Sequence, residues 1–162
     1  MSRQVLSPQA LELPQPLELT AFARLMRAHT LLRRELEAEV LTPRGLTIND
    51  FEALLHLSKA AGQRLRRIDL VDRLVLTPSG VTRLLEGLEE AGLTENHQCD
   101  GDARVTWAQL TPTGAETIEC VGVKHTERLR TLFRDTLSEA EVEQLSELLG
   151  RLPGVGQGSC AG

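Results

Sequence analysis

Hydrophobic residues recur at every third or fourth position over most of this chain, which is the spacing of amphipathic helices. The pattern predicts long helices over about residues 17–41, 47–61, 111–133 and 138–152. Between residues 93 and 110 the apolar positions instead alternate with polar ones, as they do in β-strands. The chain is therefore predicted to be mainly α-helical with one small β element.

The predicted helices begin at residues whose side chains can accept a hydrogen bond from the free amides of a first helical turn. Two of these caps are followed by proline at the first helical position, where the missing N–H is not needed. Another has an acidic residue where the helix dipole favours it, and the last forms the pattern of a capping box. In chain order the starts are Thr47 with Asp50, Thr77-Pro78, Thr111-Pro112, and Ser138 with Glu141. The segment Thr42-Pro43-Arg44-Gly45 is predicted to break the first helix, and Pro153 to end the last.

Two shorter helices separated by a tight turn are predicted between residues 68 and 91. The first, Ile68–Leu74, would bury Ile68, Val71 and Leu74 on one face. The second follows the cap at Thr77 and stops at Gly92, the position at which helices commonly end in a left-handed glycine. Its buried face is predicted to consist of Val81, Leu84, Leu85 and Leu88.

The opposite face of this second helix opens with small hydroxyl residues and one arginine. Hydroxyl groups can bond phosphates or base edges, and arginine can bind guanine through two hydrogen bonds. Bulky side chains would hold the backbone away from a major groove, so the small Gly80 also suits a DNA contact. The residues expected to face DNA are Thr77, Ser79, Gly80, Thr82 and Arg83.

A β-hairpin is predicted directly after this helix. Its strands are formed by residues 93–97 and 104–110, and they are joined by a polar turn over residues 99–102. Residues 63–67 are short and basic, and we expect them to supply a third strand. Two helices, a tight turn and a hairpin in this order are typical of a winged helix-turn-helix.

Residues 68–114 resemble the DNA-binding core of the MarR (multiple-antibiotic-resistance regulator) family. The resemblance is carried by Leu76-Thr77-Pro78-Ser79-Gly80-Val81-Thr82-Arg83-Leu84, by Asp102-Ala103-Arg104 and by Leu110-Thr111-Pro112-Thr113-Gly114, in that order and spacing. It implies that Asp102 and Arg104 are the wing's Asp-x-Arg motif, with Arg104 contacting the minor groove or a phosphate and Asp102 bracing the wing. It also extends upstream, to the pattern from Leu46-Thr47 through Phe51 to Leu54.

The expected organisation is a single MarR-like domain over residues 17–152. Residues 46–111 would form the DNA-binding core, and residues 17–45 and 112–152 would form dimerisation helices. Three long helices with apolar faces are more than one subunit can bury, so a homodimer is expected, with a palindromic operator to match its two-fold symmetry. Residues 1–16 are interrupted by prolines and are expected to be a flexible arm or a segment packed across a partner, and residues 153–162 a flexible tail.

The overall charge does not favour nucleic-acid binding. The chain carries a formal net charge of -5. Between residues 63 and 107 there are six basic residues against eight acidic ones, whereas a DNA-binding module usually has a basic footprint. A winged helix that binds only other proteins therefore stays open as an alternative.

The remaining candidate chemistry is sparse. Family members often bind small aromatic acids between the dimerisation helices and the DNA-binding unit, and Arg24, His29 and His56 are candidates for holding an aromatic or anionic effector. His29 lies on the apolar face of the first predicted helix, which favours a core or interface histidine over a ligand. The histidines and cysteines lack metal-ligand spacing, and no cofactor motif is present, so neither a metal nor a cofactor is expected.

The three cysteines do not form a disulfide pattern. Cys99 lies beside the wing turn and is interpreted as an incidental surface thiol, with an oxidation sensor as the alternative; Cys120 is interpreted as a small packing residue. The sequence contains no nucleophile elbow and no phosphate-binding glycine loop, so an enzyme is not expected. No apolar run is long enough to cross a membrane, and we expect a cytoplasmic transcriptional regulator.

Overall fold

A computed structural model describes residues 16–99 and 102–155, with the side chains of residues 98–99 and 102–105 outside the description. The first described elements are α1 (Leu17–Leu36), a π-helical turn η1 (Glu37–Leu41) and a short 3-10 turn η2 (Thr42–Arg44). It continues through α2 (Ile48–Lys59), η3 (Ala61–Gln63), β1 (Arg64–Arg66), α3 (Arg67–Leu74) and α4 (Pro78–Glu90). The hairpin β2 (Thr94–Cys99) and β3 (Asp102–Leu110) follows, and α5 (Pro112–Arg134) and α6 (Glu139–Gly150) complete the fold.

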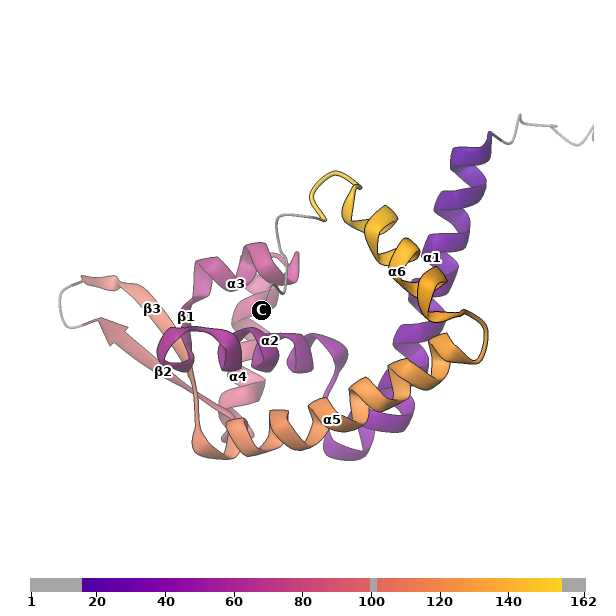
Figure 1. The fold of residues 1–162 in the computed structure, drawn as a ribbon. Helices are drawn as coiled ribbons and strands as arrows, with labels where there is room; N and C mark the ends of the chain where they lie inside the picture. Colours follow the sequence, from indigo (N-terminus) through magenta and orange to yellow (C-terminus); the bar gives the residue numbers. More distant parts are fainter. Residues whose placement is uncertain (1–15, 100–101, 156–162) are drawn as a thin grey trace, which may run out of the picture.

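The sheet has three antiparallel strands in the order β1-β3-β2. Arg64 pairs with Gln109 on one side of β3, and His97 pairs with Trp107 on the other. Figure 1 shows the β2–β3 hairpin extending away from the helices, as the wing of the predicted fold does. The mainly helical winged fold and the third strand supplied by residues 63–67 are both confirmed.

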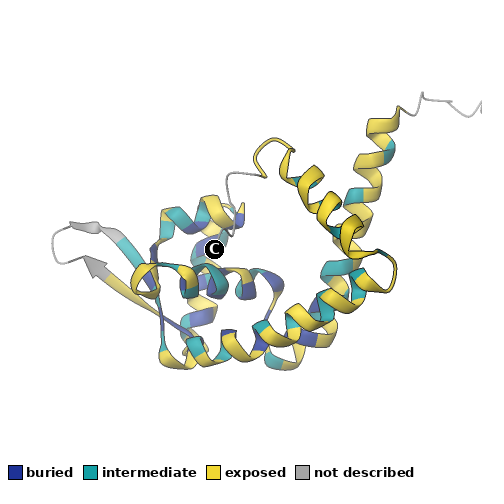
Figure 2. Ribbon diagram, viewed as in Figure 1, coloured by how far each residue is buried: buried dark blue, intermediate teal, exposed yellow. Residues whose placement is uncertain are grey.

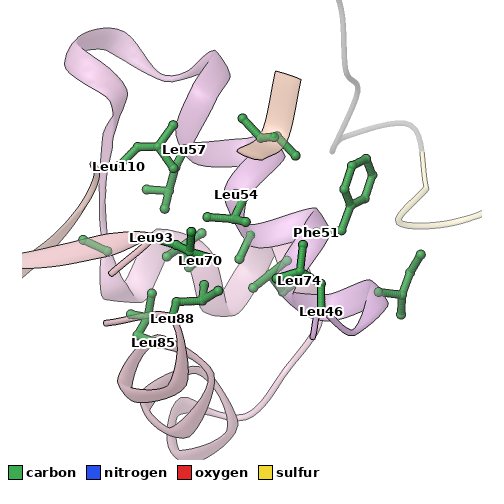
Figure 3. Packing of buried hydrophobic residues seen from close by; sticks show 14 of the residues in the cluster. Leu46, Phe51, Leu54, Leu57, Leu70, Leu74, Leu85, Leu88, Leu93 and Leu110 are labelled. Atoms are coloured by element: carbon green, nitrogen blue, oxygen red, sulfur yellow. The ribbon is translucent and has the colours of Figure 1, made fainter. Parts of the chain in front are cut away.

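One hydrophobic core holds α2, α3, α4 and the base of the sheet together. Most of its residues are leucines, and they come from several helices and strands (Figure 3). Leu54, Leu57 and Leu70 are fully buried. The predicted buried face of α4 is confirmed, because Val81, Leu85 and Leu88 are buried and Leu84 packs against the same cluster. The core therefore fixes α4 against α2, α3 and the base of the sheet.

The predicted capping residues act as expected. The Thr47 hydroxyl accepts a hydrogen bond from the Asp50 amide, and the Asp50 carboxylate in turn accepts one from the Thr47 amide. Ser138 and Glu141 form the same reciprocal pair at the start of α6. The last helix ends at Gly150 rather than at Pro153.

The long outer helices are much less buried than the core, as Figure 2 shows. In α1 only Leu36 is buried, and α6 contains no buried residue among those that the structure describes. Phe22 remains 59% exposed and Leu148 49% exposed. No helix within the described ranges is both long enough and apolar enough to cross a membrane.

The predicted buried face of α3 was wrong at its first position. Ile68 is 57% exposed, whereas Leu70 is fully buried. The helix inserts Leu70 and Leu74, which are one turn apart, into the core, and this rotation turns Ile68 toward the wing. Cys120 also differs from its interpretation as a packing residue, because it is exposed on α5.

Candidate nucleic-acid interface

The first turn of α4 presents the hydroxyl-rich face that the sequence predicted. Thr77 caps the helix, since its hydroxyl accepts a hydrogen bond from the Gly80 amide at 3.1 Å and lies 3.2 Å from the Ser79 hydroxyl. The Thr82 hydroxyl donates to the Pro78 carbonyl at 3.0 Å, which fixes its side chain against the helix. Ser79 and Arg83 are exposed, and Gly80 and Thr82 are half-buried.

The turn between α3 and α4 is held in an unusual backbone conformation. Val75 has a φ of 52°, in the left-handed region that a β-branched residue rarely occupies. Its side chain is 89% exposed, and the Leu76 amide bonds back to the Val71 carbonyl at 3.3 Å. The left-handed residue ends α3 and lets the chain turn sharply into α4.

Arginines of β1 and α3 connect the wing to the helices. The Arg64 guanidinium lies over the Trp107 ring, 5.2 Å from its centroid, and Arg67 donates a hydrogen bond to the Asn96 side chain at 3.1 Å. Arg66 is engaged differently, in a two-bond pair with the Asp69 carboxylate at 2.9 and 2.8 Å. The sequence predicted residues 63–67 as a third strand of the sheet, but it indicated no individual contact for these arginines.

Three of the sequence-based candidates belong to the wing. Asp102 and Arg104 lie on β3, and Cys99 ends β2, but the side chains of all three are outside the described residues. The backbone therefore places Asp102 and Arg104 at the end of the hairpin away from the core, where the strand pairing begins.

A second candidate site is a cavity of about 280 Å³ between α1, α2 and α5. Of the three effector candidates, His29 lines it, whereas Arg24 and His56 are not among its lining residues. Its polar side chains are His29, Arg33, Glu52 and His125, of which only His29 was singled out as a ligand. The others were missed because they come from three different helices and join only in the folded chain.

His125 stacks on Phe51 with ring centroids 4.2 Å apart, and its Nε2 atom is buried without a hydrogen-bond partner within the described residues. Burial lowers the pKa of His125, because desolvation disfavours the charged imidazolium. Partial burial raises the pKa of Glu52, against the opposing effect of Arg33 and His29. For His56, burial, Arg73 and Lys59 lower the pKa.

A helix-turn-helix with an exposed Ser/Thr/Arg helix and an adjoining hairpin defines the class of winged helix-turn-helix DNA-binding proteins.

Similarity to known sequences identifies the family. Residues 44–105 match the model of the MarR family. The HTH-type transcriptional regulator PecS of Dickeya dadantii is 31% identical over 129 residues, which cover 79% of this chain and 76% of the relative. MhqR of Bacillus subtilis, another HTH-type transcriptional regulator, is 30% identical over 108 residues, covering 67% of this chain and 72% of the relative. The chain belongs to the MarR family of DNA-binding transcriptional regulators.

Solved structures agree with this assignment. AbsC, a MarR family transcriptional regulator from Streptomyces coelicolor, superimposes with a TM-score of 0.77 at 29% identity, covering 97% of this chain and 100% of AbsC. A mutant MarR from E. coli, solved in complex with operator DNA, gives a TM-score of 0.73 at 26% identity, covering 83% of this chain and 94% of that one. The relatives are transcriptional regulators, which are not enzymes.

Proposed function

We propose that this protein is a homodimeric repressor that reads a palindromic operator through α4 and is released from it by a small molecule. The observation that carries the proposal is the N-terminal part of α4, where a capped helix packed on the core presents Ser79 and Arg83 to solvent. Thr77, Gly80 and Thr82 complete this surface, and Arg104 adds the wing contact. Asp102 is assigned to bracing the wing.

The exposed apolar faces of the outer helices support the dimer. Leu17 is 79% exposed and Phe22 59% exposed on α1, and Leu148 and Leu152 are exposed at the other end of the chain. Monomeric proteins rarely leave such a run of large apolar residues in water. We assign residues 17–45 and 112–152 to dimerisation and residues 46–111 to DNA binding. A two-fold axis would set the two α4 helices about 34 Å apart, one turn of DNA.

The cavity between α1, α2 and α5 supports an anionic effector. It lies where the dimerisation helices meet the DNA-binding core, and Arg33 and two histidines line it. Arg33 lies 3.5 Å from the Glu37 carboxylate and 3.4 Å from the Asn49 side chain, and Glu37 accepts a hydrogen bond from the Ile48 amide at the start of α2. An anion that draws Arg33 into the cavity would loosen these contacts between α1 and α2. Loss of this coupling would shift the spacing of the two α4 helices and weaken operator binding.

The test of this function is a double replacement, Arg83→Ala with Arg104→Ala, measured on a duplex enriched from a random pool. The operator affinity is expected to fall to the level of non-specific binding, while sedimentation still reports a dimer. Unchanged binding by the dimeric double variant would contradict the assignment of these residues. The matched control is Arg130→Ala on α5, which removes one charge at an exposed position outside α4 and the wing.

A further inference from the structure

A groove of about 320 Å³ lies between α4 and the wing. Pro78 and Thr82 line it from α4, Thr106 from β3, and Arg66, Arg67 and Ile68 from the β1–α3 junction. Its lining thus combines guanidinium and hydroxyl groups with apolar surface, including the exposed Ile68.

Arg67 lies in this groove with guanidinium N–H groups that make no hydrogen bond to the described residues. Its guanidinium donates one hydrogen bond, to the neutral Asn96 side chain, and its Nε atom is buried without a partner among the described residues. Arg66, the neighbouring arginine, has its charge matched by the Asp69 carboxylate at 2.8 Å. Within the described part of the chain, no carboxylate forms an ion pair with Arg67.

We propose that this groove holds the sugar-phosphate strand of the operator and that Arg67 contacts its phosphate. The inference rests on the proposed function, in which α4 lies in a major groove and the wing in the adjacent minor groove. Those two grooves are separated by one phosphodiester strand, so that strand must cross between α4 and the wing. Ile68 and Pro78 offer apolar contact to the deoxyribose, and Arg67 supplies the charge for the phosphate.

A phosphate contact can be detected from the salt dependence of DNA binding. Each neutralised phosphate contributes about 0.9 to the slope of log K against log salt concentration. Because a dimer has two such grooves, Arg67→Gln should reduce the magnitude of the slope by about 1.8. The same figure predicts binding weaker by about 30-fold at 0.15 M salt, with the affinities of variant and wild type converging near 1 M. The loss should be equal for specific and random duplexes, since a phosphate carries no base identity.

The experiment titrates salt against duplex binding for the full-length wild type and four variants of confirmed fold. Arg67→Gln should lower the slope, and Arg67→Lys should retain it because the charge remains. Asn96→Ala removes the hydrogen bond between the wing and Arg67 but keeps the charge, and it should also retain the slope. Arg66→Gln makes the same charge change one residue away and should alter the slope far less.

Three results would overturn the proposal. Equal slopes for Arg67→Gln and the wild type would remove the phosphate contact. If Arg66→Gln and Arg67→Gln lowered the slope equally, the effect would come from the overall charge of the domain and not from a contact by Arg67. Equal losses for Asn96→Ala and Arg67→Gln, without a change of slope, would make Arg67 a brace for the wing only. A wild type that binds no duplex would instead contradict the proposed function itself.

Discussion

Replacing Gly114 with alanine should destabilise the protein because α5 passes too close to the base of the wing for a side chain. A Cβ atom on Gly114 would lie 2.1 Å from the Leu93 carbonyl oxygen and 2.8 Å from a methyl group of Leu110. The Leu93 oxygen is backbone, and it already accepts a hydrogen bond from the Thr111 amide at 3.1 Å. The clash therefore cannot be relieved by rotating a side chain, and α5 must move away from the wing.

The size of the effect follows from three contributions. Overpacking costs about 1–3 kcal/mol, and a weakened Thr111–Leu93 hydrogen bond adds about 1 kcal/mol. Alanine in place of glycine within a helix returns about 1 kcal/mol. The free energy of unfolding should fall by about 2 kcal/mol, which lowers the melting temperature by about 4–8 °C for a chain of this size.

The assay is urea unfolding followed by far-ultraviolet circular dichroism, with all proteins at one concentration because dimerisation contributes to stability. Gly87→Ala is the matched control, since Gly87 lies inside α4 and a Cβ atom there would have nothing within 4 Å. That substitution should stabilise the protein by up to about 1 kcal/mol. If Gly114→Ala matched the stability of Gly87→Ala, the close approach of α5 to the wing would be refuted.

Thr77→Ala should cost about 1 kcal/mol of stability in urea unfolding by removing the α4 cap, and Thr77→Ser should recover it; equal stability of the two would contradict the capping role. Val75→Asn should raise the unfolding free energy by up to about 1 kcal/mol because asparagine tolerates the left-handed backbone better; a loss of stability would refute the strain. Leu148→Glu should give a monomer in sedimentation and weaken operator binding, whereas Glu147→Lys at the neighbouring position of α6 should leave a dimer. Burial lowers the folded-state pKa of His125, so protonation favours the unfolded chain and stability should fall as pH drops through about 6.5; His125→Phe should flatten this dependence in unfolding experiments from pH 7 to 5, and an unchanged slope would count against it.

The elements with strong local signals could be predicted from sequence. The caps at Thr47, Thr77 and Ser138 act within four residues of their partners, so their hydrogen bonds follow from local spacing. The buried face of α4 also followed from sequence, because Val81, Leu85 and Leu88 fit one helical face and no other.

The orientation of α3 could not be predicted in the same way. Both Ile68 with Val71 and Leu70 with Leu74 have helical spacing in this short segment, so periodicity allows either face to turn inward. Packing against the core decides between them in favour of Leu70 and Leu74. The π-helical turn at η1 is a similar case, since the sequence predicted one helix through residue 41 and did not indicate this turn, in which Val40 and Leu41 are both buried.

The candidate sites differ in the same way in how far the sequence predicts them. The α4 surface is contiguous in sequence, and its capped, solvent-facing first turn could be anticipated. The cavity lined by Arg33, Glu52 and His125, and the groove lined by Arg67 and Thr106, are assembled from segments far apart in the chain. Their members become neighbours only through the packing of the outer helices and the pairing of the wing with β1.

The measurement that tests the central claim most directly is selection of bound duplexes from a pool of random sequence, using the full-length protein at low salt. Binding through two α4 helices related by a two-fold axis predicts enrichment of one palindromic site, with half-sites centred about 10 base pairs apart or a multiple of that spacing. No enrichment of any sequence would contradict DNA reading by α4, and enrichment of a single half-site without symmetry would contradict the dimer.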